Sequence, residues 1–191
     1  MIALIPCASA ENLIFCDSIP EKLVDWNSSV TLPKFDPEVG TLKQVDLSCI
    51  MNLSQGIELE NKNSMPGNFT LSILGALTAK LPSSQNISIN VNHSSEGNVS
   101  GYDGVMDYKG ASGINSSERI PTEAASKRVS TLDDFLAGSP GEGITLPVTV
   151  NIASLMKMPG SSRYGITLKA GAQVCLTYTY DAKSIAKGSK P

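Results

Sequence analysis

The residue types that carry out acid–base, nucleophilic or metal chemistry are sparse in this chain of 191 residues. Histidine occurs once, at His93, inside a polar run that predicts a solvated turn. A single histidine argues strongly against Ser-His-Asp hydrolysis and against multi-histidine metal sites. The acidic pairs Asp133-Asp134 and Glu58/Glu60 are typical of surface charge and give no glycosidase pairing. We therefore expect neither a catalytic site nor a cofactor.

Two aspartates lie in a stretch rich in Gly, Ser, Asp and Tyr, residues 97–113, which is the best candidate for a binding loop. Asp103 and Asp107 form a weak candidate for a Ca²⁺ site together with backbone carbonyl groups. Their spacing matches no calcium-binding loop, and a solvated turn is the preferred interpretation. We expect no metal site, and stabilisation by calcium in a thermal melt would reverse that expectation.

The chain has four cysteines, and no two of them have the CxxC spacing of a metal site or a redox motif. An even count in an oxidising compartment allows two disulfides with three connectivities. The alternative is that some of them are small buried hydrophobic residues. Bridges within one chain and bridges between chains both fit the spacing. The disulfide candidates are Cys7, Cys16, Cys49 and Cys175.

Acceptor motifs for N-glycosylation, Asn-X-Ser/Thr, are far more frequent than composition predicts. The 12 asparagines, in a chain that is about one fifth Ser and Thr, predict about two or three motifs by chance. An unglycosylated Ser/Asn-rich surface of a secreted bacterial protein is the alternative, and both interpretations place the protein outside the cytoplasm. The motifs begin at Asn27, Asn52, Asn68, Asn86, Asn92, Asn98 and Asn115.

The N-terminal residues form an apolar stretch that ends in Ala8-Ser9-Ala10, a small-residue pattern typical of a signal-peptidase site. Three origins fit it: the end of a signal peptide, numbering that begins inside a precursor, or a strand of the mature protein. In the third case the stretch can add as a strand to the sheet edge of a second copy. The strand-exchange candidates are Met1, Ile2, Ala3, Leu4 and Ile5.

Composition narrows the class of protein further. Charged residues make up only 17% of the chain, which is low for a cytosolic domain, and lysine and arginine are scattered. We therefore expect no nucleic-acid partner. No apolar run is long enough to span a membrane. With few aromatic residues, Val, Ile, Leu and Thr must form the interior, which favours strands.

The elements that position these residues are predicted to be strands, because alternation of apolar and polar residues dominates the pattern. The one helical signal is a short helix near 131–137, with a capping Ser130 or Thr131 and a stopping Gly138. The pattern predicts an all-β protein, an antiparallel β-sandwich of jelly-roll or Ig-like type with about 7–9 strands. The predicted strands cover residues 29–32, 42–53, 56–60 after a kink, 68–81, 85–92, 141–154 and 170–180.

Specific motifs extend this fold class to a family resemblance. The opening Leu32-Pro33-Lys34-Phe35-Asp36-Pro37 is followed by Gly40-Thr41-Leu42, and the chain closes on Val174-Cys175-Leu176-Thr177-Tyr178-Thr179-Tyr180. Together with Tyr102–Gly113, Leu132–Gly138 and Ile144–Val148, this ordered set resembles the choice-of-anchor E domain of prokaryotic secreted proteins. The resemblance covers residues 24–181 and implies an exported β domain at the cell surface, with no catalytic residues to transfer.

We accordingly expect an N-terminal extension at 1–23, a sandwich at 24–181 and a polar tail at 182–191. Since no anchor is evident in the sequence, the leading hypothesis is an extracellular structural subunit of a prokaryotic, in one variant archaeal, envelope. Its partners are copies of itself, joined by strand addition and disulfides into a filament, sheath or surface layer. The alternative is a monomeric surface module that binds carbohydrate or a protein partner.

Overall fold

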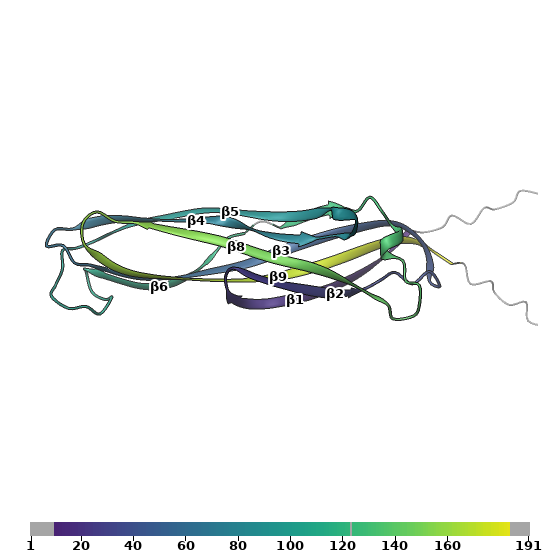
Figure 1. The fold of residues 1–191 in the computed structure, drawn as a ribbon, viewed down its shortest axis with the longest axis horizontal. Helices are drawn as coiled ribbons and strands as arrows, with labels where there is room; N and C mark the ends of the chain where they lie inside the picture. Colours follow the sequence, from purple (N-terminus) through teal and green to yellow (C-terminus); the bar gives the residue numbers. More distant parts are fainter. Residues whose placement is uncertain (1–9, 123, 184–191) are drawn as a thin grey trace, which may run out of the picture.

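The computed structural model describes residues 10–122 and 124–183, which form two packed antiparallel sheets in a long, narrow rod (Figure 1). The five-stranded sheet has the order β1–β9–β3–β6, with β7 pairing the same strand β3, and the other sheet has the order β2–β8–β4–β5. This is the strand order of a jelly roll, and it confirms the predicted all-β sandwich. The strands are β1 (Ala10–Leu23), β2 (Trp26–Pro33), β3 (Gly40–Asn61), β4 (Gly67–Lys80), β5 (Asn86–Val99), β6 (Gly113–Ile120), β7 (Ala125–Arg128), β8 (Gly143–Lys157) and β9 (Ser162–Ala182).

Two very long strands form the spine of the rod. β3 has 22 residues and β9 has 21, and they pair from Gly40–Ala182 to Asn61–Ser162. The predicted kink before Gly56 is absent, because β9 pairs with β3 straight across this position. The glycine pairs with Thr167 on one side and Ser117 on the other, so it stays inside a continuous three-stranded ladder.

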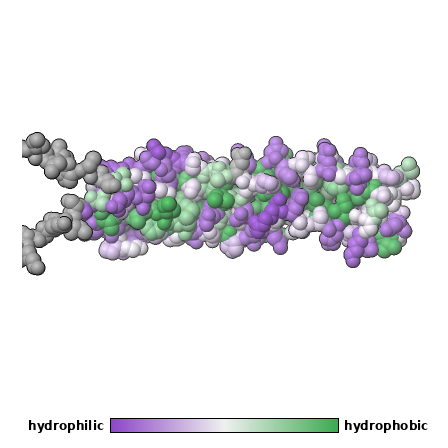
Figure 2. All heavy atoms as spheres, turned by 180° about the vertical axis from the view of Figure 1, so that it is seen from behind, coloured by the Kyte–Doolittle hydropathy of each residue, from purple (hydrophilic) through white to green (hydrophobic). Residues whose placement is uncertain are grey.

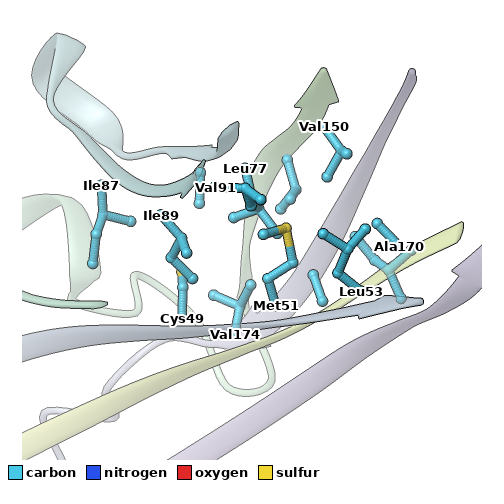
Figure 3. Close-up of a cluster of buried hydrophobic side chains, with 14 of the residues drawn as sticks. Cys49, Met51, Leu53, Leu77, Ile87, Ile89, Val91, Val150, Ala170 and Val174 are labelled. Carbon is cyan, nitrogen blue, oxygen red and sulfur yellow. The ribbon is translucent and has the colours of Figure 1, made fainter. Parts of the chain in front are cut away.

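The core lies between the two sheets and follows the alternation predicted from the sequence. Residues of odd number along β3 point inward and meet the inward side chains of β4, β5 and β8 (Figure 3). Figure 3 shows Cys49, Met51 and Leu53 facing Leu77 and Ile89 from the opposite sheet, with little space between them. Because the strands are long, this apolar layer extends along most of the rod.

The two ends of the rod differ. Ala10 pairs with Asp181, so both ends of the described chain lie at one end, here called the terminal end (Figure 1). The loops at residues 62–66, 100–112 and 158–161 meet at the other end, here called the distal end. Tyr102 N donates to Asn63 O at 2.7 Å, and Asn61 N donates to Ser112 O at 2.9 Å, which ties these loops together.

The predicted helix near 131–137 is present at the right place but is shorter, a single 3₁₀ turn at Asp133–Phe135. A tertiary contact shortens it: Phe35 N donates to Phe135 O at 2.8 Å, and Ala137 N donates to Phe35 O at 2.9 Å. The backbone after Phe135 is therefore extended beside Phe35 instead of continuing the helix. A second 3₁₀ turn lies at Pro82–Ser84.

The range 1–23, predicted as an extension, includes β1, which is an edge strand of the five-stranded sheet from Ala10 onward. The predicted tail 182–191 begins at Ala182, the last residue of β9. β6 and β7 lie outside the predicted strands, because β6 carries five consecutive exposed residues and shows no apolar alternation. Among the helices of the described residues, none is long and apolar enough to cross a membrane.

Candidate functional site

One long side of the rod is only half covered by edge strands. β1 pairs with β9 from Asp181 as far as Lys169, and β2 pairs with β8 from Gly143 as far as Val150. Towards the distal end, residues 162–167 of β9 and 153–157 of β8 have no described strand beside them on this side. Their outward backbone groups form an open edge of the kind that pairs with an added strand. We call these residues the open edge.

The open edge begins where the chain crosses from one sheet to the other. Asp25, between β1 and β2, has a φ of 63°, a left-handed conformation that aspartate tolerates better than most residues. Its carboxylate accepts from Ile152 N at 2.9 Å, and Val24 N donates to Leu168 O at 3.1 Å. Trp26 then enters the core and fixes the crossing at mid-length. The crossing therefore ends β1 and β2 together and leaves the distal half uncovered.

Core-facing side chains are accessible beside the open edge. Tyr164 and Ile166 pair with Leu59 and Ile57, whose side chains are buried on the inner face, so they point inward too. Tyr164 is nevertheless 50% exposed, and Ile166 is only half-buried. Further along the same strand, where β1 lies alongside, Ala170 is fully buried. An added strand with apolar residues would cover Tyr164 and Ile166 as β1 covers the core-facing residues in the terminal half of β9.

On β8 the same pattern holds. Ser154 pairs with the buried Ile73 and therefore points inward, yet it is exposed. Leu155, on the outer face, is 55% exposed. Hydrophobic residues at the surface are elsewhere interspersed with hydrophilic ones, as Figure 2 shows for the face opposite the view of Figure 1.

The opposite long side of the rod is more completely closed. β5 and the β6/β7 edge approach each other there, and Lys127 Nζ donates to Asn86 O across the gap at 3.0 Å. The outward positions of β5 are polar throughout. The two long sides thus differ in chemistry, one bearing accessible apolar core and the other a polar edge strand.

The cysteines are arranged within the chain. Cys16 and Cys175 lie opposite each other on β1 and β9 and form a disulfide. Cys49 is buried in the core, where burial raises the pKa of its thiol to about 11, so the thiol stays neutral. Of the two alternatives left open by the sequence, Cys16 and Cys175 form a bridge within the chain, and Cys49 is a small buried residue. Cys7 and the strand-exchange candidates Met1–Ile5 lie outside the described residues.

The two aspartates of the weak calcium candidate act as turn caps. Asp103 Oδ1 accepts from Val105 N at 2.9 Å, and Asp107 Oδ1 accepts from Lys109 N at 3.0 Å. The described residues contain no group of three or more His, Cys, Asp or Glu side chains arranged to hold a metal ion. The candidate thus consists of two locally bonded carboxylates.

His93 lies in a strand and not in a turn. β5 continues to Val99, and His93 pairs with the buried Ile73, so its half-buried ring points inward. The predicted solvated turn is therefore wrong. Polar residues flank His93 and are typical of a turn, but an edge strand such as β5 also tolerates polar residues on both sides of His93.

A shallow pocket of about 760 Å³ lies at the distal end. Asn63 holds its floor together: the side-chain amide donates to Ser161 O at 3.0 Å, and its carbonyl accepts from Ser161 N at 2.8 Å. Met65, 70% exposed, is the main apolar surface on its rim. No local pattern in the sequence indicates this pocket, because the loops that line it are far apart along the chain. The loop 97–113 contributes only Asn98 to its lining.

All seven acceptor asparagines of the N-glycosylation motifs are exposed. They lie on five strands: Asn27 on β2, Asn52 on β3, Asn68 on β4, Asn86, Asn92 and Asn98 on β5, and Asn115 on β6. Asparagines with a structural role are of another kind. Asn61 is fully buried and donates to Met65 O and Ser100 O, and neither Asn61 nor Asn63 begins an acceptor motif.

No family model matches the chain, and no curated protein matches it. Among solved structures it is similar to a chain of infectious bursal disease virus strain Gx, at 13% identity and a TM-score of 0.26. A T=1 particle derived from the same virus matches at 13% identity and a TM-score of 0.24. The alignments cover 97% and 96% of this chain, which spans about two fifths of the viral chains, 42% and 41%.

Proposed function

We propose that the protein is an extracellular structural subunit that polymerises head to tail by strand addition. In this proposal the segment Met1–Ile5 of one copy pairs along the open edge of β9 in the next copy. The observation that carries the proposal is the half-covered side of the rod, where the backbone of β9 and the core-facing Tyr164 and Ile166 are accessible. The protein has no catalytic role in this proposal.

Strand direction supports a second copy as the donor. β1 begins at the terminal end and runs antiparallel to β9. When a second copy stacks on the distal end of the first, the residues before its Ala10 would lie along the open edge of the first copy. Their chain direction would be the same as that of β1 in the first copy. The donated segment would then continue the line of β1 along β9 and complete the five-stranded sheet.

The same chain is a poor donor to its own open edge. Ala10 pairs with Asp181, and the open edge begins at Thr167, 14 residues away along β9. At the rise of a strand this distance is about 46 Å. Nine residues span at most about 32 Å. The chain would also have to run back past β1, which already occupies that side of β9. Pairing between copies meets neither obstacle.

The donor and the open edge match in length and in chemistry. The open edge of β9 has six residues, 162–167, and the donor offers five apolar residues before Pro6, which has no backbone N–H and ends pairing. Alternation places Ile2 and Leu4 on one face of the donor and Ala3 and Ile5 on the other. Either face brings a large aliphatic residue against Ile166, and full burial of each contributes about 1.5–3 kcal/mol.

The extracellular address rests on the disulfide between Cys16 and Cys175, since such bonds persist mainly in oxidising compartments. The membership in the choice-of-anchor E family, and with it a prokaryotic or archaeal envelope, stays a prediction from motifs. A filament, a sheath or a surface layer forms according to how head-to-tail rows of subunits associate with one another. A head-to-tail row is the element common to all three.

The first test substitutes Leu4→Asp and Ile5→Asp together in the full chain, so that whichever face of the donor turns inward carries a charge. The variant is examined by negative-stain microscopy and light scattering. We expect the unsubstituted protein to form rows or filaments and the double variant to remain a monomer of about the chain mass, 20.1 kDa. The matched control is Ile14→Asp, which places a charge on an exposed isoleucine of β1 and should leave assembly intact. Assembly of the double variant, or a monomeric unsubstituted protein, contradicts the proposal.

The second test addresses the donor as a separate molecule. A synthetic peptide of residues 1–9 should bind the double variant and shorten the filaments of the unsubstituted protein. The variant Ile166→Lys should not bind the peptide. Its melting temperature serves as the control that the variant is folded. An N-terminus of the native protein that begins after Ala10 removes the donor and contradicts the proposal directly.

A monomeric module that binds carbohydrate or a protein partner is the second candidate, and the distal pocket favours it. Asn68 and Asn98 line the pocket beside Met65. A monomer that binds oligosaccharides, and loses that binding on Met65→Asp, would support this function in place of assembly.

A further inference from the structure

We infer that the protein carries N-linked glycans along β5, and that this cover confines strand pairing to the opposite side of the rod. The inference goes beyond the proposed assembly, because the glycans can be present or absent whether or not the copies polymerise. It rests on the placement of the acceptor motifs and on the contrast between the two long sides.

The acceptor side chains have the accessibility that modification needs. All seven are exposed on strands, and Asn61, the fully buried asparagine that holds the distal loops, lies outside the motifs. Transfer forms a bond between asparagine Nδ2 and the anomeric carbon of an oligosaccharide. The bond from that carbon to a lipid-linked phosphate breaks, and the proton of the amide passes to a base of the transferase. Each exposed Nδ2 is open to such an enzyme.

The three motifs on β5 form a regular row. Asn86, Asn92 and Asn98 are six residues apart, so all three point outward from the same face of an edge strand. Six residues of strand span about 20 Å. Sugars at this interval cover the whole length of the strand and obstruct the approach of a second sheet. Covering an exposed edge is a known way to prevent edge-to-edge aggregation.

The other long side carries a single motif, at Asn27 on β2, the strand that covers the terminal half of β8. β1, β8 and β9 contain no acceptor asparagine, and these three strands form the surroundings of the open edge. Asn151 on β8 is exposed but is followed by Ile152-Ala153 and is therefore not an acceptor. The motifs thus spare the open edge itself, on which the core-facing Tyr164 is accessible.

Two of the motifs compete with each other. Asn68 on β4 and Asn98 on β5 are direct cross-strand partners, so their Cβ atoms are about 5 Å apart. Two branched sugars do not fit side by side at that distance, and one glycan shared between the two positions is expected. Both asparagines are in the lining of the distal pocket.

Mass spectrometry of the protein purified from the cells that produce it tests the inference. We expect an intact mass above the chain mass of 20.1 kDa, reduced to that mass by chemical deglycosylation, with sugar peptides at Asn86 and Asn92. Asn92→Gln should remove one glycan. The matched control Asn90→Gln changes an exposed asparagine on the same face of β5 that begins no motif, and should remove none.

Two further variants separate the motif from the side chain. Ser94→Ala should remove the glycan on Asn92 without changing the asparagine, and Ser94→Thr should retain it. Asn68→Gln should leave the number of glycans unchanged, because Asn98 becomes the sole acceptor of the pair. An intact mass equal to that of the bare chain overturns the inference, and this readout does not depend on assembly.

The role of the cover is tested by the triple variant Asn86→Gln, Asn92→Gln and Asn98→Gln. If glycans block the β5 edge, the variant rows should associate side by side into bundles in negative stain, whereas glycosylated rows stay separate. Unchanged rows would show that the sugars have no part in limiting contacts. Loss of the rows themselves would contradict the assignment of assembly to the opposite side.

Discussion

Trp26 is the residue on which the crossing between the two sheets depends. It is only 7% exposed, and its indole N–H donates to Ala170 O at 3.1 Å, which joins the start of β2 to β9 in the other sheet. Lys22 Nζ lies 4.7 Å from the ring centroid and covers the solvent side. Trp26 is therefore a residue of the core.

Trp26→Ala should lower the free energy of unfolding by about 3–5 kcal/mol, because it leaves a large cavity and an unpaired carbonyl on Ala170. Urea denaturation followed by circular dichroism measures the change. Leu155→Ala, at a position 55% exposed, is the control and should change stability by about 0.5 kcal/mol or less. A Trp26→Ala protein as stable as the control would contradict the packing role.

A second residue cluster closes the terminal end. Tyr178 is fully buried, packs against Phe35 with ring centroids 5.8 Å apart, and donates its hydroxyl to Pro33 O at 2.8 Å. Burial raises the pKa of Tyr178, so the hydroxyl stays protonated and continues to donate. The motif residues of the opening and closing segments thus meet in one aromatic contact.

At the scale of elements, β1 is the strand whose attachment decides what is available for exchange. It lies at the edge of its sheet and pairs only with β9 among the described strands. The disulfide from Cys16 to Cys175 fixes its middle to that partner. In the proposed assembly a second copy takes up residues before Ala10, and the pairing of β1 with β9 stays intact.

Replacing both cysteines by serine should lower the free energy of unfolding by about 3–5 kcal/mol, because the bridge closes a loop of 159 residues in the unfolded chain. Hydrogen exchange should then increase more in β1 than in β3, which is paired on both sides. Equal increases in both strands would show that the bridge stabilises the fold as a whole and not the attachment of β1.

At the scale of the whole molecule, the length of the rod determines the geometry of the proposed row. β3 runs from the terminal end to the distal end with 22 residues, which corresponds to about 70 Å. Since the donor leaves at one end and the open edge lies towards the other, each added copy advances the row by about one rod length.

Filaments formed by strand addition should therefore have an axial repeat of about 70 Å in averaged electron micrographs. The measurement is the axial repeat of filaments of the unsubstituted protein. A repeat near the width of the sandwich, about 20–30 Å, would indicate side-by-side stacking and contradict the head-to-tail arrangement.

Much of the fold could be predicted from local pattern. Alternation along the chain identified the long strands and the inward residues, such as Val45, Leu47 and Leu71, because each strand repeats its own two-residue period whatever lies beside it. It failed for β6, which has five consecutive exposed residues, and for the polar stretch around His93. In both cases pairing to a neighbour, and not burial, holds the strand.

Residue types and their short-range period are enough to predict the all-β class, the apolar layer between the sheets and the acceptor motifs. Only the tertiary structure decided that Cys16 meets Cys175, that Cys49 is buried, and that β1 and β2 stop halfway along β9 and β8. Contacts between residues far apart in the chain determine which strands lie side by side. They also determine where one strand extends beyond the end of its neighbour. The open edge, and the function proposed for it, is of that second kind.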